Sequence, residues 1–172
     1  MIPVKEAKSI IHKHIPLSGT ETVLLKDAGN RILAQDIVAL FPMPSFDNSA
    51  MDGFAVRTVD TKGTDQSFPV RLKMVGVSSA GSPGDITLGP GECAQCMTGA
   101  IIPNGADAIV MVEDTSGFSD IDSVQIFQEV KIGEHIRKKG EEIQDGDVLI
   151  PKGTCITPNE IGTLATFGYG EI

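Results

Sequence analysis

The middle of the chain alternates short apolar runs with clusters of glycine, proline, aspartate and serine. Val70–Val77, Ile109–Val112 and Val124–Phe127 are the clearest runs, and turn sequences such as GSPGD at 81–85 and GPGE at 89–92 lie between them. Short apolar runs bounded by turns of this kind are typical of β-strands, whereas a helix needs a longer amphipathic pattern. The pattern therefore predicts a compact β module.

The two ends of the chain carry helical patterns instead. From Val4 to Ile15, apolar residues recur at spacings of three and four, which predicts an amphipathic helix. Near the other end, residues 157–160 read Thr-Pro-Asn-Glu. This is a capping box with proline at the first helical position, and it predicts a helix over 158–167.

The segment between the first helix and the β module is expected to change from helical to extended. Residues 27–35 are expected to form a further helical turn or two that carries Ile32 and Leu33 inward. Pro42 and Pro44 follow, and each removes a backbone donor and disfavours helix in the residue before it. They predict an extended crossing between two modules.

These patterns together predict an α+β, mainly β fold with two interleaved parts. Residues 1–45 and 148–172 are expected to form a mixed α/β layer built from the two chain ends. Residues 46–147 are expected to form a β-barrel-like module inserted between them. The closing helix leaves only four residues after Gly168, so we expect the chain to be connected to something further on.

The charge balance excludes two classes of partner. The 172 residues contain 14 Lys and Arg against 23 Asp and Glu, which gives a formal charge of −9. Broad nucleic-acid binding needs an excess of Lys and Arg to neutralise phosphates, and so does adhesion to an anionic membrane. We therefore expect neither a nucleic acid nor a membrane as a partner.

The N-terminal sequence and the cysteines bear on location. No apolar stretch reaches the roughly 18 residues typical of a transmembrane helix. Lys5, Glu6 and Lys8 interrupt the segment where a signal peptide has its apolar core. The three cysteines do not form a secreted disulfide framework, and Cys93 and Cys96 would face opposite sides of a strand as ordinary small residues. We expect a cytoplasmic location.

A polar stretch at residues 47–53 is the first candidate for chemistry. Asp47 and Asp52 can present carboxylates to a divalent cation, since Mg²⁺ favours one or two carboxylates completed by water and substrate phosphates. The alternative is that Asp47, Asn48 and Ser49 bond neighbouring backbone groups, as turn residues do. Residue types alone leave both interpretations open.

Two further segments can contact an anion. In the loop 97–107, the Thr98 hydroxyl and the Gly99 amide can approach an anionic ligand, although the loop is also explained by shape alone. Arg, Lys and Lys at 137–139 form the one dense basic cluster, which can hold a phosphate by charge-assisted hydrogen bonds. The alternative is that the glutamates at 141–142 neutralise it.

Three segments in the same order resemble one known family. They are PSFDNSAMDGFAV at 44–56, MTGAIIPNGADAIVMVED at 97–114, and the tail from Ile136 to Ile172. This combination resembles the molybdopterin molybdenumtransferases, called MoeA in bacteria and similar to the E domain of gephyrin. The resemblance implies the fold of the MoeA N-terminal region, with the pterin-binding and C-terminal domains of the family absent from this chain.

The resemblance also implies an activity and partners. Family members take adenylylated molybdopterin from a molybdopterin adenylyltransferase, insert molybdate into it with Mg²⁺ present, and release AMP. The full-length enzyme is a homodimer with a composite site, so this chain is expected to supply half of that site and to be inactive alone. The alternative is a non-catalytic scaffold or interaction module of the gephyrin type.

The resemblance assigns roles residue by residue. Asp52, Thr98 and Glu142 are expected to be catalytic, with Asp52 also a metal ligand. Glu142 stands where family sequences commonly have aspartate, so its carboxylate lies one methylene further from the backbone. The expected substrate-binding residues are Asp47, Asn48, Ser49, Arg137 and Lys138.

Overall fold

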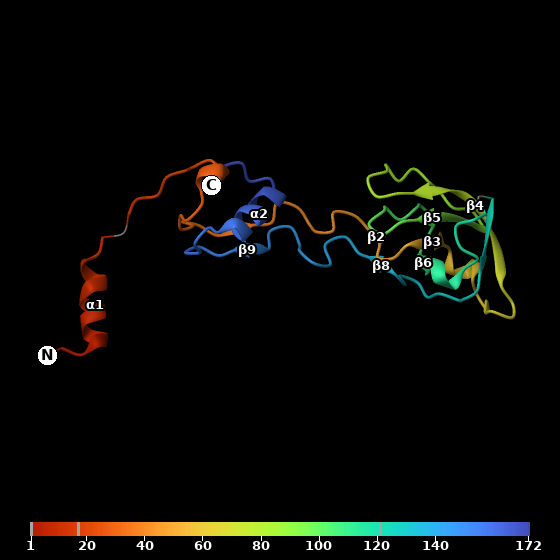
Figure 1. Cartoon of the computed structure of the whole chain (residues 1–172), viewed down its shortest axis with the longest axis horizontal. Coiled ribbons are helices and arrows are strands. Elements are labelled where there is room, and N and C mark those ends of the chain that lie inside the picture. The colour runs from red at the N-terminus through yellow and green to blue at the C-terminus, as the bar shows by residue number, and fades with distance from the viewer. Residues whose placement is uncertain (1, 17, 121) are drawn as a thin grey trace. The chain divides into compact units, whose positions relative to one another are not determined.

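The computed structural model describes residues 2–16, 18–120 and 122–172 (Figure 1). The chain folds into two compact units. Unit 1 consists of Met1–Leu40 and Val148–Ile172, and unit 2 consists of Phe41–Asp147. Strands outnumber helices along the chain, so the predicted α+β, mainly β fold class is confirmed.

Unit 1 is built around one short strand pair and one helix. Strand β1 (Ile37–Val38) pairs antiparallel with β9 (Val148–Ile150), and helix α2 (Pro158–Thr166) follows. The Tyr169 hydroxyl donates to the Val38 carbonyl at 2.8 Å, and the backbone of Val23 pairs with that of Ile172. The buried core consists of Ala28, Leu33, Ile37, Ile150, Ile156 and Leu164.

Helix α2 begins as the sequence predicts. The Thr157 N–H donates to the Glu160 carboxylate at 2.8 Å, the Thr157 hydroxyl bonds to the same carboxylate, and the Asn159 N–H donates to Thr157 Oγ1. Gly168 follows the helix with φ +82°, a conformation that glycine adopts without strain. The capping box and the closing glycine are both confirmed.

Helix α1 (Val4–His14) forms as predicted, and none of its residues is buried. The segment that follows differs from expectation. After the short 3-10 helix η1 (Leu25–Asp27) the chain does not continue as a helix, so the prediction for 27–35 was wrong. Asn30 has φ +63° and Ile32 bridges to Cys155, so the backbone is extended there. Neighbouring side chains then alternate in direction, and Ile32 is 61% exposed while Leu33 is buried.

Unit 2 contains a curled, half-barrel sheet of five strands. The β4–β5 pair is parallel and the other pairs are antiparallel. Three of the strands, β4, β6 and β7, coincide with the apolar runs singled out in the sequence. The strand order is β6 (Ala108–Met111), β3 (Gly53–Val56), β5 (Glu92–Cys96), β4 (Val70–Ser78) and β7 (Ser123–Ile126).

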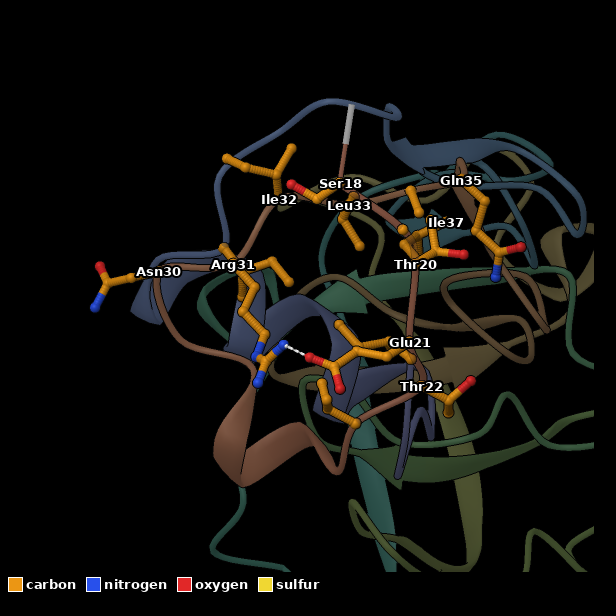
Figure 2. Close-up of a pocket in the computed structure, with 15 residues that line it drawn as sticks. Ser18, Thr20, Glu21, Thr22, Asn30, Arg31, Ile32, Leu33, Gln35 and Ile37 are labelled. Atoms are coloured by element: carbon orange, nitrogen blue, oxygen red, sulfur yellow. Dashed lines mark hydrogen bonds and ion pairs between the residues drawn. The ribbon is translucent and has the colours of Figure 1, made fainter. Parts of the chain in front are cut away.

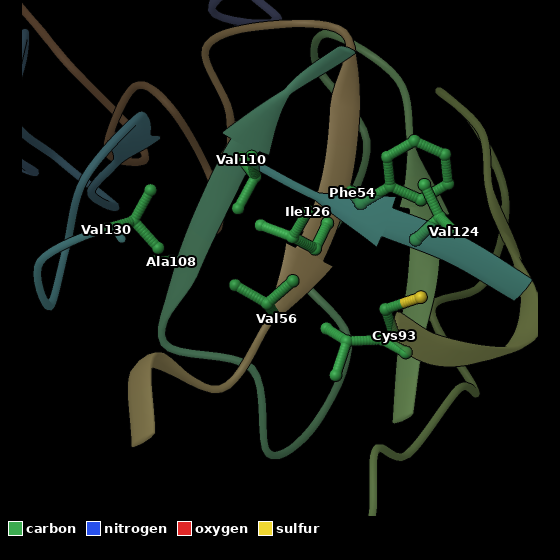
Figure 3. Close-up of a cluster of buried hydrophobic side chains, with 9 residues drawn as sticks. Phe54, Val56, Cys93, Ala108, Val110, Val124, Ile126 and Val130 are labelled. Atoms are coloured by element: carbon green, nitrogen blue, oxygen red, sulfur yellow. The ribbon is translucent and has the colours of Figure 1, made fainter. Parts of the chain in front are cut away.

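The strands β6, β3 and β5 of the unit 2 sheet are largely buried on both faces. Phe54 and Val56 of β3 belong to the cluster drawn in Figure 3, while Ala55 between them belongs to a second cluster. Cys93 and Cys96 of β5 likewise lie in different clusters, as their spacing predicts. Burial raises the pKa of Cys93 to about 12 and that of Cys96 to about 11, so both thiols stay protonated at neutral pH.

The remaining elements of unit 2 are short. Strands β2 (Asn48–Ser49) and β8 (Ile136–Arg137) form a separate two-stranded ribbon. The 3-10 helices η2 (Thr58–Asp60) and η3 (Val112–Asp114) follow β3 and β6. Of the helices in the described residues, none combines the length and the apolar character needed to cross a membrane.

Candidate active site

Asp52 and Thr98 are 46 residues apart in the sequence and hydrogen-bonded in the structure. Asp52 immediately precedes β3, and Thr98 follows β5. These strands pair so that Gly53 lies opposite Cys96, which brings both residues to the same end of the sheet. Asp52 Oδ1 accepts hydrogen bonds from the Thr98 N–H and from the Thr98 hydroxyl, each at 2.8 Å. The two predicted catalytic residues are therefore direct neighbours.

The two hydrogen bonds set the ionisation of Asp52. The backbone N–H of Thr98, followed by its hydroxyl, lowers the pKa of the Asp52 carboxyl below its usual range. The side chain is exposed, and its second oxygen has no hydrogen-bond partner among the described residues. Asp52 thus presents an ionised carboxylate with one oxygen free for a cation.

The close packing of the backbone at residue 53 explains why glycine follows Asp52. A Cβ placed at this residue would lie 2.0 Å from the carbonyl oxygen of Val110 on the neighbouring strand β6. No side chain fits in that space, because real Cβ atoms essentially never approach backbone so closely. The close passage of β3 against β6 fixes the backbone on which Asp52 stands.

The β2–β8 ribbon supplies the cationic part of the site. Asn48 pairs with Arg137 in this ribbon. The Ser49 carbonyl accepts from the Gly99 N–H at 2.8 Å and from Arg137 Nη2 at 3.4 Å. The guanidinium of Arg137 therefore lies beside the loop that carries Thr98.

Asp47 and Lys138 form an ion pair next to the ribbon. Asp47 Oδ2 accepts from Lys138 Nζ at 2.8 Å, and Oδ1 accepts from the backbone N–H of Lys139 at 2.8 Å. These bonds, the first of them most, lower the pKa of the Asp47 carboxyl. Glu141 accepts a hydrogen bond from the Lys138 backbone N–H at 2.7 Å. Its carboxylate therefore stabilises the turn and is not bonded to the Lys138 ammonium group.

Residue types did not reveal the backbone contribution of Lys139. The sequence placed it in a basic cluster, but its contact with Asp47 uses the main-chain N–H. Any residue other than proline supplies such a group, so residue type carries no signal for it. The glycine that follows, Gly140, has φ +72° and marks the tight turn that makes the contact possible.

Two of the predicted substrate-binding side chains are buried. Asn48 is 4% exposed and Ser49 is 0% exposed. The Ser49 hydroxyl donates to the Met51 carbonyl at 2.6 Å, which is the local turn bonding named as the alternative in the sequence. Substrate contact by these two residues stays a prediction.

Glu142 stands apart from the other predicted site residues. Its backbone N–H donates to the Met43 carbonyl at 3.1 Å. Its side chain is exposed and has no hydrogen bond or ion pair to any described residue. Hydrogen bonds within unit 2 link the other seven predicted residues, either to one another or through the loop at 97–100, and leave Glu142 out.

The donor set of the site suits a cation completed by a ligand. In the described ranges, no group of three His, Cys, Asp or Glu side chains is placed to hold a metal ion. Asp52 offers one free carboxylate oxygen, and Mg²⁺ is commonly bound by one or two carboxylates together with water and substrate phosphates. The residues present fit Mg²⁺ held in that way and do not form a cage of their own.

The site residues line neither of two pockets in the described residues. A pocket of about 560 Å³ in unit 1 is crossed by the ion pair between Arg31 and Glu21, 2.5 Å apart (Figure 2). A pocket of about 420 Å³ in unit 2 lies between residues 64–67 and residues 113–114 and 127–128. Asp52, Thr98 and Lys138 are exposed, so this part of the candidate site is an open surface of unit 2.

Comparison with known proteins agrees with these motifs. The family model described as "MoeA N-terminal region (domain I and II)" matches residues 2–168. The chain is 43% identical over 171 residues to the molybdopterin molybdenumtransferase of Staphylococcus aureus strain N315, covering 99% of this chain and 40% of that protein. It is 41% identical over 173 residues to the protein of the same name from Bacillus subtilis, again covering 99% of this chain and 40% of the relative.

A solved structure shares the fold. The crystal structure of the molybdopterin biosynthesis moeA protein from Pyrococcus horikoshii OT3 matches with a TM-score of 0.90 and 31% sequence identity, covering 100% of this chain and 45% of that one. The chain thus spans less than half the length of these relatives. Since the family model covers nearly the whole sequence, the chain belongs to the family of the MoeA N-terminal region, domains I and II.

Proposed function

We propose that this chain is the N-terminal part of a molybdopterin molybdenumtransferase, an enzyme of molybdenum cofactor biosynthesis. Family membership and the names of the relatives in Staphylococcus aureus and Bacillus subtilis support this. The proposed reaction inserts molybdate into the dithiolene of adenylylated molybdopterin. The bond between the adenylyl group and the molybdopterin phosphate is hydrolysed, and AMP leaves.

The observation that carries the proposal is the hydrogen-bonded cluster of unit 2. It joins Asp52 to Thr98, places the Arg137 guanidinium beside the same loop, and sets Lys138 next to the ribbon. A carboxylate, a hydroxyl and two cations at one surface suit a ligand that carries phosphates and an oxyanion. A purely structural surface has no need for this combination.

Each residue has a task under this proposal. Arg137 binds an anionic group of the substrate with the N–H groups left free by its bond to Ser49. Thr98 fixes Asp52 in its ionised form, because both of its donors point at one carboxylate oxygen. Lys138 is already paired with Asp47, so it adds to the local field and becomes free for a ligand only when that pair opens.

Asp52 is the residue proposed to hold Mg²⁺, through its free carboxylate oxygen. The ion would neutralise the substrate phosphates at the bond that breaks. Glu142, exposed and unpaired among the described residues, is proposed to act only after the site is enclosed. Its longer side chain gives it about 1.5 Å more reach than an aspartate, one carbon–carbon bond length.

The open surface supports a composite site. We propose that the full-length protein is a cytoplasmic homodimer in which this chain supplies half of each site, and that this chain alone is inactive. A molybdopterin adenylyltransferase would supply the substrate. The share of each relative that the chain spans, 40%, leaves room for the pterin-binding part elsewhere in such a protein.

A chimaera tests the proposal directly. This chain would replace the corresponding N-terminal 40% of the Bacillus subtilis relative. We expect molybdate-dependent and Mg²⁺-dependent AMP release from adenylylated molybdopterin by the chimaera, and none by the isolated chain. Asp52→Asn in the chimaera should lower the rate by about 100-fold or more.

The control variant is Asp85→Asn, a change of the same kind at an exposed residue outside the candidate site. It should leave AMP release unchanged. A folded, dimeric chimaera that releases no AMP would contradict the proposal and favour the scaffold alternative. Full AMP release by the isolated chain would refute the composite site.

A further inference from the structure

Two polar side-chain atoms of the candidate site are buried without a hydrogen-bond partner among the described residues. They are Asn48 Oδ1 and Arg137 Nε. The first is an acceptor and the second carries a donor hydrogen. Buried polar groups are paired in the great majority of cases, so two complementary orphans in one site call for an explanation.

The two residues are direct partners in the ribbon. Asn48 of β2 lies opposite Arg137 of β8 in an antiparallel pair, and such partners project their side chains from the same face. The Asn48 amide nitrogen donates to the Phe46 carbonyl at 3.2 Å. With the nitrogen engaged, the amide has its oxygen left for a donor, and Arg137, its partner across the ribbon, carries an unpaired Nε–H.

The Nη2 end of the Arg137 guanidinium is bonded to the protein. Arg137 Nη2 donates to the Ser49 carbonyl, which also accepts from the Gly99 N–H beside Thr98. A guanidinium is planar, so a contact at Nε in addition to the one at Nη2 would fix its plane. The remaining Nη hydrogens would then be directed by the protein before any ligand arrives.

We propose that Asn48 is a positioning residue for Arg137. No direct bond joins the two atoms in the structure, so a buried water that accepts the Arg137 Nε–H and donates to Asn48 Oδ1 completes the contact and orients the guanidinium toward an anionic group of the substrate. This inference rests on the proposed function, in which Arg137 binds that group. It offers Asn48 a role other than direct substrate contact, since its side chain is 4% exposed and its Oδ1 is buried.

The Asn48 amide is neutral, so it can hold Arg137 without compensating its positive charge. Lys138 faces the carboxylate of Asp47, so its charge is compensated within the protein. Arg137 has no ion pair to any described residue, and a neutral acceptor holds it without cancelling its charge. Asn48→Asp would keep the acceptor and add the charge, whereas Asn48→Leu would remove the acceptor at similar size. The two variants therefore separate geometry from electrostatics.

The first test uses this chain alone and the NMR signal of the Arg137 Nε–H group, assigned by its disappearance in Arg137→Lys. In Asn48→Leu, hydrogen exchange of this group should accelerate by about tenfold or more, the factor that a hydrogen bond to a charged group is worth. Asn48→Asp should keep the slow exchange. Asn104→Leu, the same change at an exposed loop residue, is the control and should alter nothing.

An unchanged exchange rate in Asn48→Leu would overturn the inference. If that variant does not fold, as its backbone amide spectrum would show, Asn48→Ala removes the same acceptor without adding bulk. Slow exchange in folded Asn48→Ala would then overturn it, and accelerated exchange would support it.

The second test uses the chimaera and distinguishes the two proposals. If Asn48 acts through Arg137, then Asn48→Leu should raise KM for adenylylated molybdopterin, and it should cause no further loss in a protein that already carries Arg137→Lys, because coupled residues are not additive. Asn48→Asp should raise KM while leaving the NMR signal intact. Additive losses would contradict positioning. A chimaera without any activity would instead contradict the proposed function, and the exchange experiment would still decide the role of Asn48.

Discussion

The two halves of the candidate site stand on different backbones. Asp52 is attached to β3, a strand of four buried residues that pairs with β5 on one side and with β6 on the other. Arg137 and Asn48 belong to a ribbon of only two residue pairs. The first half inherits its geometry from the core of unit 2, while the second depends on a few side-chain and loop contacts.

This difference separates rigidity from adaptability within one site. Opening β3 requires the loss of a buried sheet, so the carboxylate half is fixed by the global stability of unit 2. The ribbon opens at the cost of few hydrogen bonds, and its charges are exposed or half-buried. We therefore expect core variants to abolish the site and ribbon variants to tune it.

The largest effect is expected for Phe54→Ala in β3. Phe54 is fully buried, and its ring lies 5.2 Å from that of Phe118. Removing it should lower the free energy of unfolding by about 3–5 kcal/mol, the range for large aromatic truncations. Urea unfolding measures this. Phe68→Ala, at a residue that is 76% exposed, is the matched control and should change stability by no more than about 0.5 kcal/mol.

Equal losses from the two phenylalanine variants would remove the basis of the comparison. They would mean that the core of unit 2 does not control its stability. A large loss of stability from Phe54→Ala alone would support the comparison between the β3 half and the ribbon half of the site.

A smaller effect is expected for Gly53→Ala. The added Cβ meets the Val110 carbonyl oxygen at 2.0 Å, and backbone cannot rotate away as a side chain can. We expect a loss of about 1–3 kcal/mol, typical of overpacking, measured by urea unfolding. Gly162→Ala in α2 is the control, since nothing lies within 4 Å of that site. It should be neutral or stabilising, because alanine favours helix. A neutral Gly53→Ala would show that β3 yields easily.

Local patterns predicted the elements that depend on local chemistry. The apolar runs at 70–77, 109–112 and 124–127 became β4, β6 and β7, and the Thr157 capping box became the start of α2. Strand β5 was not among the predicted apolar runs, because Glu92–Cys96 has no apolar alternation of its own, and the sequence only placed Cys93 and Cys96 on a strand. Its parallel pairing with β4 is a long-range contact, which no local pattern encodes.

The candidate site shows the same limit of local sequence patterns. Residue types nominated Asp52 and Thr98 without indicating that they meet, because the β3–β5 register brings them together across 46 residues. Residue types also left open whether Ser49 binds substrate or its own turn, and burial of its hydroxyl against Met51 follows from the tertiary fold. The resemblance to a family supplied the roles, which neither spacing nor composition contains.

The smallest effect is expected for Asp47→Asn, in the adaptable half. The Asp47–Lys138 pair is roughly half exposed on both sides, so its loss should cost less than about 1 kcal/mol at pH 7. The pKa of Asp47 is lowered in the folded protein, so its contribution is present above the pKa of the unfolded chain and is lost as pH falls through the lowered value. The stability difference between wild type and variant should therefore shrink on acidification, and also in high salt.

Unfolding curves at several pH values measure this difference, with Asp85→Asn as the control for a general charge effect. A difference that grows on acidification would show that the ion pair does not stabilise the ribbon, and the adaptable half would then be held by Arg137 and the backbone alone.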